Sequence, residues 1–262
     1  MRLTELPRTV ELDAGSTSLV VGEDWLQGRS AFGGLQAALA VIAMRSLVPA
    51  GLPLRTLQTT FIAPVPPDRA LAQARVLRVG KSATQVEARL LQGAEVLAIV
   101  IGVFGSARPS TIARSPSMPS VDATQAISLP CAEGSAAPSF TWHFAARWIH
   151  GGLPFTGNPS SASVVELDLI DSGPMSEAHL IAIADFIPPV ALSMLDRPTP
   201  GASMTWMLEV VRERYDDQRL DGGRVDAQML AAASSYTSQS TLIFAPDGKL
   251  AATSHQSMVV FG

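Results

Sequence analysis

The sequence LAIVIGVFG, at Leu97–Gly105, has a counterpart in SHQSMVVFG, at Ser254–Gly262. Both end in Val-Phe-Gly, and both have the composition of a β-strand. The earlier copy is apolar almost throughout, whereas the later copy carries Ser254–Ser257 where the earlier one has Leu97–Val100. The pair indicates an internal repeat in which one copy has exchanged apolar side chains for amides and hydroxyls.

The segments that precede these two strands repeat as well. A glycine-rich start and a Pro/Gly exit predict a helix over 33–51, and the segment 177–195 is expected to hold its counterpart. Gln92-Gly93 and Asp247-Gly248 are expected hairpin turns. Four strand-like segments follow each helix: 54–65, 70–80, 82–92 and 94–105, then 202–214, 223–237, 239–245 and 249–262. Further strand candidates precede each helix: 9–13, 16–22, 140–149 and 163–170.

The segment between the two copies is rich in Ser, Pro and Ala and has little periodicity, so residues 106–138 are expected to be a linker. The chain then divides into residues 1–105, the linker and residues 139–262. The helix around Gly33–Met44 is apolar on nearly all sides, which is typical of a buried helix. We therefore expect a duplicated α+β unit, in which each curved antiparallel sheet wraps around one helix.

Composition limits the functions that the chain can have. Hydrophobic residues make up 47% of the 262 residues and charged residues 16%, enough for a large core. The net charge of -4, with no basic run, makes nucleic acid an unexpected partner. The low charge fraction hints at burial against another subunit, so a homodimer or higher homo-oligomer is an expectation.

Cys131 is the sole cysteine, so neither an intramolecular disulfide nor a cysteine zinc cluster is expected. The histidine spacing suggests no metal site. No signal peptide and no apolar run of the ~18 residues that a membrane span needs are expected, and a cytoplasmic location is the simplest reading.

Several short motifs resemble the double-hotdog fold of the acyl-CoA thioesterase II-like family. The resemblance rests on the order and spacing of QGRSAFGGLQAALAV (27–41), LQTTFIAPVPPDRALAQARVLRVGKS (57–82), ADF (184–186), SMTWMLEV (203–210) and TSHQSMVVFG (253–262). It implies hydrolysis of an acyl-CoA thioester, with no cofactor besides the CoA of the substrate. Gln58 and Thr60 stand where family members often carry a histidine and an aromatic residue.

In that family an Asp, a Thr or Ser hydroxyl and a Gln hold one water beside the thioester carbon. The resemblance assigns these roles to Asp185 near the start of the second helix, to Ser203 with Thr205 as its competitor, and to Gln256. Asp185 interrupts an apolar run. It could be a base with a raised pKa, or it could cap the N-terminus of the helix. Gln256 shares a strand face with Met258 and Val260, and a structural amide is its other reading.

Ser203 and Thr205 share a face by alternation, where solvated hydroxyls are common. The letters align Gln256 with Ile99, which predicts that the first half cannot bind this water. His255 points away from Gln256 by alternation, so we expect it to be solvated rather than a base.

Two further groups are candidates for substrate binding. Backbone N–H groups of Gly33 and Gly34, at a helix start, could stabilise the thioester oxyanion, or the two glycines could serve close packing. The resemblance suggests that Gly80, Lys81 and Ser82 meet the CoA phosphates, although a solvated turn is the commoner meaning of such residues. Two other functions stay open: an enoyl-CoA hydratase on the same fold, and a non-catalytic protein that binds acyl-CoA or another small ligand.

Overall fold

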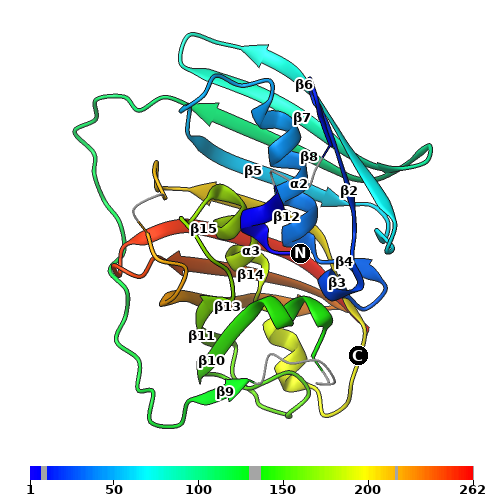
Figure 1. The fold of residues 1–262 in the computed structure, drawn as a ribbon. Helices are drawn as coiled ribbons and strands as arrows, with labels where there is room; N and C mark the ends of the chain where they lie inside the picture. The colour runs from blue at the N-terminus through cyan, green and yellow to red at the C-terminus, as the bar shows by residue number, and fades with distance from the viewer. Residues whose placement is uncertain (7–10, 130–136, 216–217, 262) are drawn as a thin grey trace.

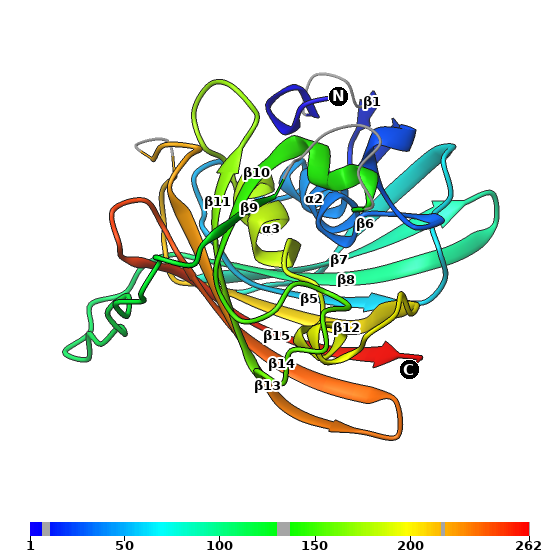
Figure 2. The ribbon, with the colours of Figure 1, turned by 90° about the horizontal axis from the view of Figure 1, so that it is seen from below.

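The computed structural model describes residues 1–6, 11–129, 137–215 and 218–261. Cys131 and part of the expected linker and first strand lie outside these residues. The described strands form one 13-stranded sheet and one two-stranded hairpin. Figures 1 and 2 show that the large sheet curves around the two α-helices, which lie together on its concave side. The double-hotdog prediction is therefore confirmed, and the side of the sheet that faces the helices is called the inner face below.

The two halves join edge to edge through antiparallel pairing of β5 and β12, in which Thr59 lies opposite Trp206. The sheet order is β1-β2-β6-β7-β8-β5-β12-β15-β14-β13-β11-β10-β9. The strands of the first half are β1 Glu11–Asp13, β2 Ser16–Val20, β3 Leu26–Gln27, β4 Ser30–Ala31, β5 Leu54–Phe61, β6 Arg69–Val79, β7 Ala83–Gln92 and β8 Glu95–Gly105. The later strands are β9 Ile127–Leu129, β10 Phe144–His150, β11 Ala162–Leu169, β12 Gly201–Val210, β13 Gly223–Ala233, β14 Tyr236–Phe244 and β15 Leu250–Val260.

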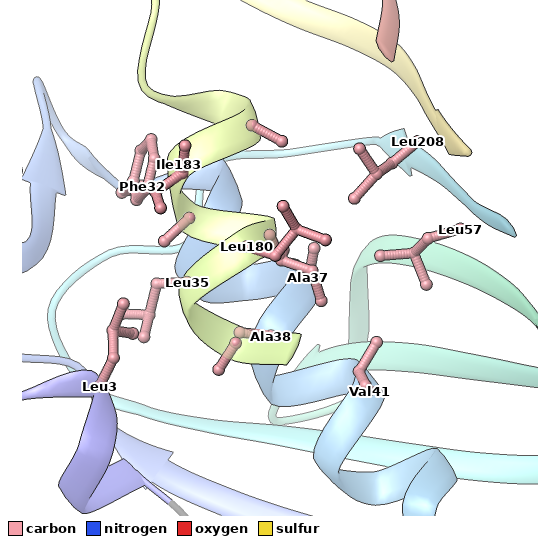
Figure 3. Packing of buried hydrophobic residues seen from close by; sticks show 14 of the residues in the cluster. Leu3, Phe32, Leu35, Ala37, Ala38, Val41, Leu57, Leu180, Ile183 and Leu208 are labelled. Carbon is pink, nitrogen blue, oxygen red and sulfur yellow. The ribbon is translucent and has the colours of Figure 1, made fainter. Parts of the chain in front are cut away.

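Helices α2 (Gly33–Arg45) and α3 (Glu177–Asp185) pack against each other in the core. They run antiparallel, because Arg45 at the end of α2 pairs with Glu177 at the start of α3, while Gly34 lies against Ala182. Figure 3 shows the apolar side chains that fill the contact and reach the sheet at Leu57 and Leu208. The described residues also form four short 3-10 turns, at Leu3–Glu5, Glu23–Trp25, Ser139–His143 and Val190–Met194.

The expected hairpins at Gln92-Gly93 and Asp247-Gly248 are confirmed, and both glycines have positive φ. The expected single strand over 223–237 is wrong, because the chain turns at Ser234 and Ser235, whose φ angles are 51° and 68°. This turn lacks the Gly or Asn that such angles favour, so no residue pattern predicted it. The expected linker contains β9, which pairs with β10, and Figure 1 shows the chain before it passing along the outside of the sheet.

The segment Glu177–Met194 corrects the expectation that no apolar run reaches membrane-spanning length. It has 18 residues with a mean hydropathy of 1.3, enough by length and composition alone. In the structure 72% of it is buried inside the protein, and α3 ends within it at Asp185. Core packing of α3 and the following turn accounts for this composition.

The glycine at the crossing of the two helices gives a stability prediction. A Cβ on Gly34 would lie 2.5 Å from Cε1 of buried Phe32 and 3.0 Å from Cα of Ala182. We expect Gly34→Ala to lower the free energy of unfolding by about 1–3 kcal/mol, because Phe32 is stacked on Phe140 and Cα of Ala182 is backbone of α3, so both neighbours resist displacement. Urea denaturation measures this, with Gly223→Ala as the control, since its nearest neighbour would be 3.4 Å away. An unchanged midpoint for Gly34→Ala would show that the crossing relaxes.

Candidate active site

Asp185 is the last residue of α3, so the expectation that it lies near the start of its helix, or caps its N-terminus, is wrong. The proline pair that follows, Pro188-Pro189, had favoured a helix start, but it belongs to the chain that leaves α3. A carboxylate at a helix C-terminus meets the negative end of that helix dipole. Asp185 is therefore held by groups outside α3.

Those groups come from both halves of the protein. Gln256 of β15 donates from Nε2 to Oδ1 of Asp185 over 2.6 Å. The backbone N–H of Gly34, in the first turn of α2, also donates to this carboxylate. A Cβ on Gly33 would lie 2.6 Å from Oδ2 of Asp185 and 3.0 Å from Cζ of Phe61. The glycines thus serve close packing, and they also bring the positive end of α2 to the carboxylate.

Burial raises the pKa of Asp185 to about 7, while the hydrogen bonds from Gln256 and Gly34 lower it. Desolvation outweighs these hydrogen bonds because the carboxylate is buried where the end of α3 meets the start of α2. The residue keeps some solvent exposure, unlike its neighbours Ala184 and Phe186. A carboxyl that changes protonation state near neutral pH can accept a proton from a bound water.

Gln256 lies on the inner face and is 4% exposed, as the alternation with Met258 and Val260 predicts. Its alignment with Ile99 is wrong by one residue, because the inner-facing residues of β8 are Ala98 and Val100. A shift of one residue along a strand moves a side chain to the other face. The inner face of β8 nevertheless carries no amide at these positions.

The expectation that Ser203 and Thr205 share a face is also wrong. Ser203 pairs with buried Met258, but Thr205 pairs with Ser257, so the register shifts by one residue between them. Such a bulge places two residues opposite one and turns the side chains that follow. Ser203 therefore lies on the inner face, diagonal to Gln256, and Thr205 is exposed on the outer face.

Other candidate residues lie elsewhere. Gly80, Lys81 and Ser82 form the β6–β7 turn beside Gly105, at the end of β8 away from Asp185. Val100 of β8 pairs with Thr59, which lies opposite Trp206 of β12. Gly105 is five residues further along β8 than Val100, a distance of roughly 17 Å. A contact between this turn and the CoA phosphates stays a prediction.

Three polar residues on the strands beside the site face outward. His255 is exposed and contacts Ser238 Oγ through Nε2 at 3.1 Å, as alternation predicts. Gln58 and Thr60 also lie on the outer face of β5, because inner-facing Thr59 stands between them. The residues that depart from the family pattern therefore do not line the inner face.

One buried amide near the site was not predicted from the sequence. Gln239 of β14 is 1% exposed and lies directly opposite Gln256. Its neighbours Thr237 and Thr241 share the inner face. The polar residues 237–241 look solvated in the sequence. Recognising which of them face inward requires the turn at Ser234-Ser235, which was not predicted.

Comparisons with known proteins agree with this architecture. Three solved structures match over nearly their whole length and show the same fold: a hot dog fold protein from Alicyclobacillus acidocaldarius (21% identity, TM-score 0.87, 100% of this chain and 99% of that one), a putative thioesterase II from Thermobifida fusca (15%, 0.79, 100% and 98%) and the tesB protein of Mycobacterium avium subs paratuberculosis (16%, 0.78, 100% and 100%). No curated protein sequence matches the chain.

Two family models match the chain in succession. The N-terminal domain of acyl-CoA thioesterases matches residues 21–105, and the C-terminal domain matches residues 112–260. Asp185 and Gln256 lie in the second match, whereas Gly33 and Gly34 lie in the first. With both domains present over most of its length, the chain belongs to the acyl-CoA thioesterase family.

Proposed function

We propose that the protein hydrolyses acyl-CoA thioesters to the free acid and CoA. The observation that carries the proposal is the Asp185 carboxylate, whose pKa is raised to about 7 and which is bound at once by Gln256 and by the start of α2. Family membership and the thioesterase fold of the solved relatives support this activity.

In the proposed reaction, Asp185, Gln256 and Ser203 hold one water beside the thioester carbonyl carbon. Asp185 takes a proton from this water as its oxygen forms a bond to the carbon. The backbone N–H of Gly33 faces the developing oxyanion, which the helix N-terminus favours, while that of Gly34 stays with Asp185. The carbon–sulfur bond then breaks, and the proton held by Asp185 passes to the CoA sulfur. The reaction consumes one water and needs no cofactor.

The direct test is release of CoA thiol from a panel of short, long and aromatic acyl-CoAs and one enoyl-CoA. Thiol release from any member of the panel other than the enoyl-CoA supports the proposal and identifies the acyl class. Loss of the enoyl absorbance without thiol release would select a hydratase instead. Thermal stabilisation by acyl-CoA without turnover of any member would select a binding protein.

Because of the bulge in β12, we predict different effects of removing the hydroxyl of Ser203 and that of Thr205. We expect Ser203→Ala to lower kcat by about tenfold or more, the usual cost of losing one hydrogen bond to a reacting group. Thr205→Val should leave kcat unchanged, because its hydroxyl lies on the outer face. Steady-state kinetics on the best substrate of the panel measures both. The opposite ranking would place the hydroxyl role on Thr205.

A further inference from the structure

Gln239 is held in one orientation by a main-chain group. Its Oε1 accepts a hydrogen bond of 2.8 Å from the backbone N–H of Val190, and the contact is buried. An N–H can donate only to the carbonyl oxygen of a carboxamide, so this bond fixes which end of the amide is which. The other end, Nε2, is buried and has no hydrogen-bond partner among the described residues.

Gln239 lies directly opposite Gln256 on the sheet. The two residues are direct cross-strand partners on β14 and β15, and both are buried on the inner face. Side chains in such a pair have Cβ atoms about 4.5–5.5 Å apart. Gln256 gives its Nε2 to Asp185, so its Oε1 is the end that can accept a hydrogen bond. A buried donor and a complementary acceptor therefore stand on neighbouring strands.

We propose that Gln239 is a positioning residue: its Nε2, which makes no hydrogen bond within the described part of the chain, pairs with Oε1 of Gln256 after a small side-chain movement or through one water, and so keeps Nε2 of Gln256 turned toward Asp185. The role rests on the proposed function, since it concerns the same water site. If Gln256 turned over, it would present an oxygen to the carboxylate and an amino group to Nε2 of Gln239, so that neither pairing could form. An unmet buried donor costs about 1–3 kcal/mol, which favours the orientation seen here.

Val190 also gives Gln239 a purely structural alternative. It begins the 3-10 turn Val190–Met194, which follows α3 and Asp185 closely along the chain. A residue that only anchors this turn would affect folding, but it would not act through Gln256. The two roles therefore differ in whether a change at Gln239 still matters once Gln256 is gone.

The first measurement is the pKa of Asp185, followed by carboxyl carbon NMR in labelled wild type, Gln239→Leu and Thr237→Val. Because the Gln256 bond lowers the pKa of Asp185, its loss should raise that pKa in Gln239→Leu. Thr237→Val is a matched control, since it removes a buried, unpartnered hydroxyl from the same face of β14. It should titrate as wild type does. An unchanged Asp185 titration in Gln239→Leu would overturn the proposal.

The second measurement is a double-mutant cycle of Gln239→Leu and Gln256→Leu on kcat. We expect Gln239→Leu to lower kcat about tenfold with KM unchanged, and to add nothing in the Gln256→Leu background. Multiplying effects would show that Gln239 acts independently, and would overturn the positioning role. Gln239→Met, which keeps the length of the side chain and adds no charge near Asp185, replaces Gln239→Leu in the titration and the cycle if that variant does not fold. Absence of thiol release by the wild type would refute the proposed function, while the titration would still decide this inference.

Discussion

Replacing Asp185 with asparagine is expected to lower kcat for thioester hydrolysis by roughly a hundred- to ten-thousandfold, the range that a general base contributes. The substituted amide keeps nearly the same shape but cannot take a proton from water. KM should change little, because the side chain acts on the water rather than on the acyl group. Thiol release under substrate saturation measures the loss. A variant with wild-type kcat would place the base elsewhere.

The same carboxyl determines the pH dependence of the wild type. A base must be ionised, so kcat/KM should rise about tenfold per pH unit below 7 and level off above it. In Asp185→Asn this limb should disappear from whatever activity remains. A profile that is flat between pH 5 and 8 in the wild type would contradict the raised pKa.

Unfolding reports the same pKa without substrate, and it also controls for folding of the variant. The pKa of Asp185 rises from 3.8 to about 7 on folding, so between these values the folded protein binds more protons than the unfolded chain. Its contribution to stability is therefore present at low pH and is lost as pH rises toward 7. Wild type should lose stability across this window relative to Asp185→Asn, and run parallel to it above.

The fold followed from the sequence because its signals are local and repeated. Apolar helices beginning at Gly33 and Glu177, each followed by four strand-like segments, were enough to predict two sheets wrapped around two helices. Asp185 and Gln256 were also found, mainly through the family resemblance, with the carboxylate in an apolar run and the amide in an inward-facing strand position as local signs. The structure brings them within 2.6 Å of each other, although 71 residues separate them.

Single-residue register was the part that the sequence could not provide. The bulge between Ser203 and Thr205 and the turn at Ser234-Ser235 depend on pairing with neighbouring strands, not on the residues themselves. Each one changes which side chains face inward downstream. The missed turn is why Gln239 was not recognised as a buried neighbour of Gln256. Ile99 was aligned to the wrong face because the two matching Val-Phe-Gly endings have opposite orientations, with Phe104 buried and Phe261 exposed.

Gln256→Leu should produce the second large effect, a fall in kcat of about ten- to a hundredfold. Leucine has a similar size and suits a buried inner-face position beside Met258, so the fold should be kept. It removes the donor that contacts Asp185 Oδ1 and one of the groups proposed to orient the water. It also removes a bond that lowers the pKa of Asp185, so the acid limb of the pH profile should move to higher pH.

The neighbouring residue His255 supplies the control for Gln256→Leu. It lies on the same strand, but its side chain is exposed on the outer face and contacts Ser238. His255→Ala should therefore leave both kcat and the pH profile as in the wild type. A histidine that acted as the base would reverse this ranking, with His255→Ala losing activity and Gln256→Leu keeping it. Since alternation along β15 puts the two side chains on opposite faces, only one of these residues can touch a water bound to Asp185.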